Sequence, residues 1–247
     1  MIHIFEAIVF VSYSFLAAII TAGGSMLVTN VLSLADIDLI KAAGLTSSYF
    51  LVNAIIGCYV FRSDIVWREV KNILPITILG AFVGSIFLVN INPTILLSLM
   101  LVFSVRFIYK KIKIIDAKEV VKDSFLKEQF IGLFAGSVTG AALPGGGFLN
   151  SYFASKGFTL SQMFGTLNFI IPFVFTVKVS VMLNAGLLVP SDFIGVAIAF
   201  PFLIVSNTLV RKGLIKLSKS TTDKITIFAM VIFSLYALVT IVLNLRG

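Results

Sequence analysis

Three kinds of residue are scarce in this chain of 247 residues. It has one cysteine and one histidine, and Asp, Glu, Lys and Arg together make up only 12% of it. The lone Cys58 excludes a disulfide within the chain, and a lone histidine leaves no Cys–His cluster for a metal ion. The net charge is +8, but nucleic-acid binding is a poor interpretation, because the sequence has no soluble domain that could bind a nucleic acid. We expect no metal, no cofactor and no nucleic-acid partner.

The apolar segments also lack the residues of an active site. His3 is terminal, and no aspartate falls within an expected membrane span, so neither a nucleophile–base pair nor a pair of aspartates is in place. A glycine-rich phosphate loop with its lysine is missing too, which argues against ATP as the direct energy source. We therefore expect no enzyme and no catalytic residue.

Apolar residues are abundant instead. They form 59% of the chain, and the mean hydropathy is +1.09, whereas a soluble domain is nearer half apolar and a quarter charged. The sequence therefore predicts an all-α polytopic membrane protein in contact with the lipid bilayer. Long apolar helices are expected at residues 4–20, 39–61, 73–89, 129–143, 160–183, 193–210 and 225–245, with a further helix that ends near 109 and short apolar pieces that end near 34 and 153.

Two breaks interrupt this apolar sequence. Each glycine costs a helix roughly 1 kcal/mol, and proline removes a backbone donor. Within a membrane, broken backbone is tolerated where it is buried in protein or lines a cavity, and the free N–H groups of half-helices suit an anion. A plain turn at the membrane surface is the alternative. The breaks consist of Gly23, Gly24 and Ser25 in the first half, and of Pro144, Gly145, Gly146 and Gly147 in the second.

A patch of small residues follows each break after about twenty residues, at 42–47 and at 164–168. Each patch is followed by a long apolar run, an aspartate (Asp64 or Asp192) and a helix that contains a proline. Interrupted segments at corresponding positions of two halves are the best sequence pointer to the substrate site of a transporter.

The positive charges of equivalent loops are swapped between the halves. Residues 62–71 carry three basic residues and their counterpart 184–192 none, whereas residues 90–93 carry none and their counterpart 211–224 five. By the positive-inside rule, the halves then insert in opposite orientations, which requires an odd number of crossings in each. We predict two inverted-topology repeats, each a re-entrant helical hairpin plus three transmembrane helices. Eight crossings with parallel repeats are the alternative. The expected divisions are a first membrane repeat at 1–112, a basic cytoplasmic linker at 113–127 and a second membrane repeat at 128–247.

At these residues the chain resembles the sulfite exporter TauE/SafE family of membrane transporters. The resemblance rests on the doubled pattern of glycine break, apolar piece and small-residue patch, and it covers essentially the whole chain. The first half departs from the pattern: Ser25 replaces a third glycine, and Leu45 separates Gly44 from Thr46. The resemblance implies a secondary transporter, an exporter of small sulfur-containing anions such as sulfite or organosulfonates, in the bacterial inner membrane.

An anion in the middle of a membrane needs hydrogen-bond donors, which the breaks and the adjoining helices supply. Pro172 leaves the carbonyl of Asn168 without its usual donor, so a kink is expected there. The alternative for the small residues is that they only let helices approach, as we expect for Gly80 and Gly84. The candidate substrate-binding residues are Gly23, Gly24, Ser25, Thr46, Ser47, Gly145, Gly146, Gly147, Asn150, Gly165, Thr166, Asn168 and Lys178.

Lys178 lies in an apolar run with no acidic residue nearby in the sequence. An ionisable residue within a membrane is a functional candidate, although a snorkelling side chain is the alternative. Asn53 is a polar residue in an apolar run and is a candidate to face the pathway. Proton coupling through Glu6 stays open, and no buried pair of acids, the usual sign of a proton relay, is expected.

The alternative function is a passive anion channel of the same architecture. A structural membrane scaffold is a further alternative, but it would not need two costly glycine breaks. The sequence leaves open the substrate, the direction of transport, the coupling ion and the association into a homo-oligomer.

Overall fold

The computed structural model of the protein describes residues 2–17, 24–33, 37–112, 125–142, 146–212, 227–228, 231–232 and 234–242. Every regular element in this part of the chain is helical, which confirms the all-α class. The elements are α1 (Ile2–Ala17), α2 (Gly24–Ser33), α3 (Leu39–Val60), η1 (Arg62–Asp64), α4 (Trp67–Asn90), α5 (Pro93–Ile112), α6 (Phe125–Gly140), α7 (Gly146–Ser155), α8 (Leu160–Asn184), η2 (Pro190–Phe193) and α9 (Ile194–Arg211).

Long apolar helices confirm that the chain is a polytopic membrane protein. About 20 apolar residues in a helix cover the hydrocarbon core of a bilayer. α3 begins where the carboxylate of Asp38 accepts a hydrogen bond from the backbone N–H of Ile40 at 2.9 Å. α8 begins with a capping box between Thr159 and Gln162. The described segments long and apolar enough to span are Leu39–Val60, Trp67–Asn90, Leu160–Asn184 and Pro190–Arg211.

α4 begins earlier than the sequence predicts. The charged residues at 62–71 predict a turn, but only Phe61, η1 and residues 65–66 separate α3 from α4. Val70 and Ile73, three residues apart, are both buried, and Glu69 is an acidic residue in the first turn, where the helix dipole favours it. Burial of this apolar face outweighs the charged composition and extends the helix back to Trp67.

Two short helices follow the breaks, as the sequence predicts. α2 and α7 each have 10 residues, which is about 15 Å of helix and half of what a bilayer core requires. α7 folds back along α6, because Lys156, just after α7, lies 2.5 Å from a carboxylate oxygen of Glu128 in the first turn of α6. α6 and α7 therefore form a hairpin whose two arms start and finish at the same end of the molecule.

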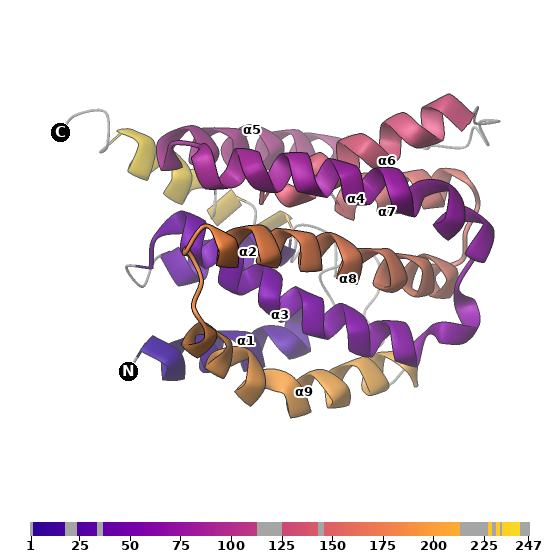
Figure 1. Cartoon of the computed structure of the whole chain (residues 1–247), viewed down its shortest axis with the longest axis horizontal. Coiled ribbons are helices and arrows are strands. Elements are labelled where there is room, and N and C mark those ends of the chain that lie inside the picture. Colours follow the sequence, from indigo (N-terminus) through magenta and orange to yellow (C-terminus); the bar gives the residue numbers. More distant parts are fainter. Residues whose placement is uncertain are drawn as a thin grey trace.

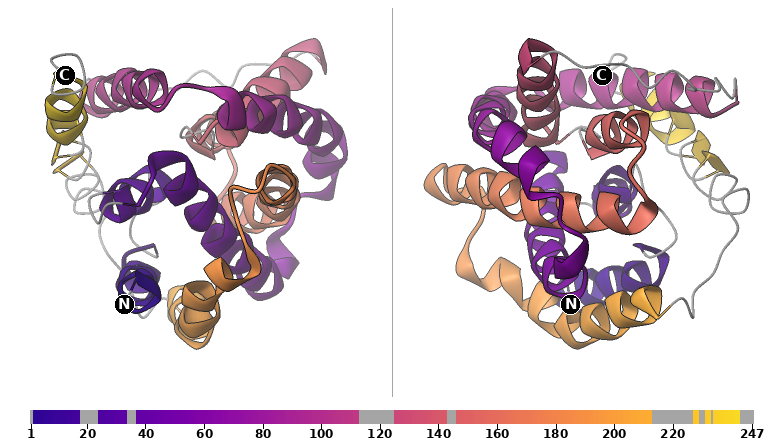
Figure 2. Two further views of the ribbon diagram at one scale, coloured as in Figure 1. Left: turned by 60° about the vertical axis from the view of Figure 1, so that its left-hand side comes forward. Right: turned by 90° about the vertical axis from the view of Figure 1, so that its right-hand side faces the viewer.

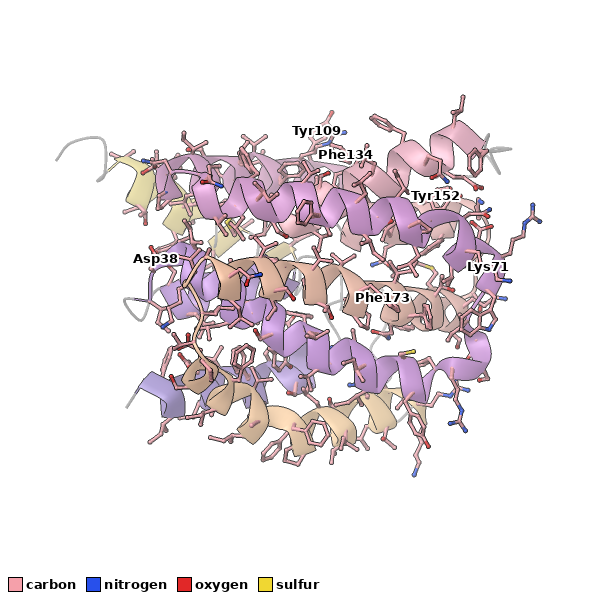
Figure 3. The ribbon with its side chains drawn as sticks, viewed as in Figure 1. Asp38, Lys71, Tyr109, Phe134, Tyr152 and Phe173 are labelled. Atoms are coloured by element: carbon pink, nitrogen blue, oxygen red, sulfur yellow. The ribbon has the colours of Figure 1, made fainter. Side chains whose placement is uncertain are left out.

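Ion pairs and close contacts define the two ends of the bundle. At one end, Lys41 near the start of α3 pairs with Asp192 at 3.0 Å, and Glu6 of α1 packs against Gly195 of α9. We call this the Lys41 end. Figure 3 shows Asp38 there and Lys71 and Tyr152 at the other end. That other end, the Arg211 end, joins the last residue of α9 to the turn between α3 and α4 through an ion pair of Arg211 with Asp64.

The helices pack in three layers (Figures 1 and 2). α4, α5 and α6 form one outer layer, α3 and α8 lie in the middle, and α1 and α9 form the other outer layer. The principal pairs are α4 with α6, α3 with α8 and α1 with α9. Helices from the two halves of the sequence thus pack against each other in every layer. The domain boundaries and the inverted relation of the halves remain predictions.

Small residues bring α4 and α6 into backbone contact, as predicted for Gly80 and Gly84. A side chain at Gly84 would collide with the carbonyl oxygen of Ser137, and one at Gly80 with that of Leu133. Gly136 and Gly140 of α6 stand in the same relation to α4 backbone atoms. The spacing of four residues places glycine on one face of each helix, so the backbones meet directly.

Candidate functional site: a polar pocket beside the first hairpin

A pocket of about 70 Å³ lies among α1, α3, α8 and α9. It faces the Arg211 end, because Phe61, Phe164 and Val210 come from the parts of their helices that lie at this end. Its inner wall is polar and includes Ser14, near the end of α1, so the pocket borders the last turn of α1. The lining residues are Ser14, Asn53, Phe61, Phe164, Asn168, Ser206, Asn207 and Val210.

The two serine hydroxyl groups of the pocket already donate hydrogen bonds within the protein. Ser14 Oγ donates its only proton to the carbonyl of Phe10 at 2.7 Å, and Ser206 Oγ donates to Leu203 at 3.1 Å. Since a serine has one donor, the hydroxyl of Tyr49, 3.0 Å from Ser14 Oγ, must donate to it. These two serines therefore offer acceptors, rather than donors, to a ligand.

The amide groups are the donors that remain. Asn207 uses both N–H groups, one on Asn53 Oδ1 at 2.8 Å and one on the carbonyl of Leu203 at 2.9 Å. The NH₂ of Asn53 and the amide of Asn168 have no hydrogen bond within the part of the chain that the structure describes. Each amide nitrogen carries two protons. The free donors of the pocket are thus the amides of Asn53 and Asn168.

Asn168 is held in place by packing. Its side chain lies directly against Gly57 of α3, where any added side chain would collide with it. Pro172, one turn later in α8, lacks the N–H that would bond the carbonyl of Asn168. At Asn168, α8 therefore carries a free side-chain amide and a backbone carbonyl that lacks its usual helical donor.

The pocket offers uncharged hydrogen-bond donors and no acidic side chain. None of its lining residues is acidic, and its free donors are the amides of Asn53 and Asn168. Neutral donors can bind a small oxyanion without the desolvation cost of a fixed buried charge. The phenyl rings of Phe61 and Phe164, with centroids 5.6 Å apart, stand on the side of the Arg211 end.

Lys178 of α8 is buried inside the bundle, with 2% of its surface exposed, so it does not reach the surface by snorkelling. α3 and α8 run antiparallel, with Gly57 against Asn168, Phe50 against Phe175 and Gly44 against Met182. In this register Lys178 lies at the level of Ser47. Within the described residues, it forms no ion pair.

The first-half candidates lie in α2 and α3. Ser25 is half-buried in the first turn of α2, which Gly24 begins. Thr46 and Ser47 are buried in α3. Thr46 accepts a hydrogen bond from Thr29 of α2 at 3.0 Å, and Ser47 donates to its own helix. Gly23 lies outside the described residues.

The second-half candidates divide into two groups. Gly146 and Gly147 begin α7, with open space where a side chain would be, and Asn150 follows in the same helix. Gly165 and Thr166 instead pack on the turn after α3: Gly165 touches the backbone of Phe61 and Asp64, and Thr166 Oγ1 accepts from the N–H of Val66 at 3.1 Å. The structure does not bring these two groups together, and Gly145 lies outside the described residues.

Backbone strain marks the second break. α6 ends at Gly140, and Ala142, in the turn that follows, has a φ of 64°. This left-handed conformation costs a residue with a Cβ about 1–2 kcal/mol. Such strain concentrates at functional sites.

Sequence reasoning missed Ser14, Ser206 and Asn207. Each is a polar residue within an apolar run, which is the signal that singled out Asn53. The sequence does not reveal that α1 and α9 pack beside α3, and this packing places the three residues on one pocket.

A buried pair of acids, which the sequence analysis did not expect, occurs at the Arg211 end. Glu69 of α4 and Glu128 of α6 are 6% and 8% exposed. Lys156 bridges them, with its ammonium nitrogen 2.8 Å from Glu69 and 2.5 Å from Glu128. The expectation was wrong because these three residues are far apart in the chain and meet only through the packing of α4 on the hairpin.

Long apolar helices, and the hairpin of α6 and α7, define a multi-pass membrane protein that has a polar pocket between its helices. A family model described as Sulfite exporter TauE/SafE matches residues 6–238. The chain belongs to the sulfite exporter TauE/SafE family, and this membership implies a membrane transporter of the sulfite or sulfonate type. Comparisons with curated proteins and with solved structures gave no match.

Proposed function

We propose that the protein is a secondary transporter that exports small sulfur-containing anions, such as sulfite or organosulfonates, across the bacterial inner membrane. The observation that carries the proposal is the polar pocket, whose free donors are the amides of Asn53 and Asn168 and whose lining has no acid. Family membership supports the substrate class.

The anion is bound near the middle of the membrane, where the backbone amides of the broken helices add to the side-chain donors. Support comes from Ser14, which lines the pocket close to the first break, and from Gly146 and Gly147, which leave open space beside the start of α7. N–H groups in the first turn of a helix have no partner within the helix, and the dipole there favours negative charge.

Inverted insertion of the two halves is part of the proposal. It places the linker and the basic loop after Arg211 on the cytoplasmic side, which is then the side that the pocket faces. An anion leaving the cell would meet the pocket first. Cysteine labelling of residues 113–124 and 213–224 from each side tests this, and labelling of the two loops from opposite faces would contradict it.

Uptake of radiolabelled sulfite, thiosulfate and a small sulfonate into proteoliposomes, with and without a pH gradient, tests the function. We expect saturable transport that is lost in Asn168→Leu and in Gly146→Leu. The first replaces the amide donor by an apolar side chain of similar size, and the second fills the open space at the start of α7. Asn90→Leu is the matched control, since Asn90 is exposed and, among the described residues, its amide bonds its own helix at the carbonyl of Ile86. Transport of none of these anions by folded protein would overturn the substrate class.

The same assay separates a transporter from a passive channel. A transporter accumulates the anion against its gradient when a driving ion gradient is applied, whereas a channel only equilibrates it. Accumulation above the equilibrium level supports the proposal, and equilibration alone favours the channel.

A further inference from the structure

The side chain of Arg211 lies at the mouth of the polar pocket, and the proposed site does not include it. Arg211 is the last residue of α9, directly after Val210 of the pocket lining. Its guanidinium carbon lies 5.2 Å from the ring centroid of Phe61, which also lines the pocket. Arg211 therefore stands at the rim, over one of the two aromatic rings of the mouth.

Both terminal nitrogens of the Arg211 guanidinium bond residues of the turn between α3 and α4. One terminal nitrogen is ion-paired with Asp64, and the other donates to Ser63 Oγ at 3.0 Å. This two-point arrangement is the geometry in which arginine also holds the oxygen atoms of a planar or tetrahedral oxyanion. Asp64 and Ser63 thus occupy the donors that an incoming anion would use.

The turn that carries Asp64 is fixed to α8. Gly165 packs on the backbone of Asp64, and the hydroxyl of Thr166 accepts a bond from the N–H of Val66. Arg211 comes from α9 instead. The ion pair therefore connects α9 with α8 across the side of the pocket where Phe61 and Phe164 meet.

The ion pair of Arg211 with Asp64 is suited to replacement of the Asp64 carboxylate by a bound anion. The side chains of Arg211 and Asp64 are 38% and 26% exposed, and ion pairs in contact with water add little to stability. An oxyanion that replaces Asp64 keeps the charge of Arg211 compensated, while the carboxylate returns to water. We infer that Arg211 is the first binding residue for the anion at the mouth of the pocket, and that Asp64 competes with the anion for it. This inference rests on the proposed function.

Equilibrium binding of radiolabelled sulfite and of sulfate to the purified protein tests the inference. Arg211→Gln should weaken binding at least about tenfold, the effect expected of one charge-assisted hydrogen bond. Asp64→Asn should tighten binding, because it removes the competitor and leaves the guanidinium free. Opposite shifts in the two partners are the decisive sign, since a bridge that only supports the fold predicts weaker binding in both.

Asp192→Asn is the matched control, because Asp192 pairs with Lys41 at the opposite end of the bundle. It should leave the affinity unchanged, and thermal unfolding of all variants verifies that they fold. Weaker binding in Asp64→Asn, or no change in Arg211→Gln, would overturn the inference. If sulfate binds and sulfite does not, with the two shifts still opposite, the inference stands and the substrate class falls. If the wild type binds neither anion, both fall.

Discussion

Lys156 and Glu69 form an ion pair of 2.8 Å across 87 residues of sequence, between the end of the second hairpin and the first turn of α4. The same ammonium group binds Glu128, so one cation compensates two buried carboxylates from two further helices. Tyr152 of α7 adds its hydroxyl, 3.4 Å from Glu69. The pair therefore anchors the base of the hairpin whose tip is the second break.

Replacing Lys156 by Met should destabilise the protein strongly. Two buried carboxylates would lose the cation that they share, a change that costs on the order of 3 kcal/mol in buried pairs. Thermal unfolding in detergent measures the loss. Adding Glu69→Gln to the Lys156→Met variant should recover part of it, because one uncompensated charge is removed. Equal stability of wild type and Lys156→Met would show that the cluster does not hold the hairpin.

The contribution of this cluster should be constant around neutral pH. Burial raises the pKa of Glu128, but hydrogen bonds from Lys156, Tyr152 and Asn72 outweigh it and hold the pKa below its usual 4.5. Burial likewise lowers the pKa of Lys156, but its bonds to Glu128 and Glu69 raise it above 10.5. The stability that Glu128 contributes is complete above pH 4.5 and is lost as the pH falls through its lowered pKa. The stability that Lys156 contributes is complete below pH 10.5 and is lost only as the pH rises through its raised pKa. The difference in unfolding temperature between wild type and Lys156→Met should therefore be constant up to about pH 10 and shrink as acid neutralises the uncompensated carboxylates of the variant. A difference that grows as the pH falls would contradict this.

Gly84→Ala should separate α4 from α6. The added methyl group would meet the carbonyl oxygen of Ser137, a backbone atom that cannot rotate away. Overpacking of this kind costs about 1–3 kcal/mol, more than the helix propensity of up to about 1 kcal/mol that alanine gains over glycine. Gly147→Ala is the control, because its surroundings are open. Unfolding temperatures should fall for Gly84→Ala only, and an equal fall in both variants would mean that helix contact is not the cause.

Much of the architecture follows from local sequence. Glycine, proline and apolar runs predict the helices, the two breaks and the 10-residue arms, because these depend on neighbouring residues. The spacing of Gly80 and Gly84 also predicts a close helix contact, since a face of a helix is a local property. The start of α4 was misplaced, because charged residues at its first turn are accommodated by burial of Val70 and Ile73.

The candidate site depended on information that one sequence does not contain. Asn168 was identified because it is polar in an apolar helix, but its role beside Asn53 requires the pairing of α3 with α8. Thr166 has the same sequence signal as Asn168 and yet bonds a loop N–H. A polar side chain such as Thr166 forms its hydrogen bond with a partner about 100 residues away. Only the fold reveals which polar side chains have such partners.

Tyr13 and Tyr49 should respond in opposite ways to the loss of their hydroxyl groups. The hydroxyl of Tyr13 is buried and, within the described residues, has no hydrogen-bond partner, whereas that of Tyr49 bonds Ser14. Tyr13→Phe removes an unsatisfied polar atom and should leave stability equal or higher, while Tyr49→Phe should lose about 1 kcal/mol. Chemical or thermal unfolding of the two variants distinguishes them. A clear loss in Tyr13→Phe would mean that its hydroxyl has a partner in the folded protein.

Lys178→Met should raise stability and lower anion transport. The side chain is buried at the level of Ser47 and, in the described part of the chain, has no ion-pair partner. Burial of a charge is unfavourable, so an uncharged side chain of similar length removes a cost of about 1 kcal/mol or more. If the charge serves the anion, uptake of sulfite by proteoliposomes falls in the same variant that unfolds at a higher temperature. Lys212→Met, at an exposed position after α9, controls for the general loss of a positive charge. If the variant is less stable but transports normally, Lys178 supports the fold and not transport. A buried charge that serves only transport would instead lower the stability of the wild type.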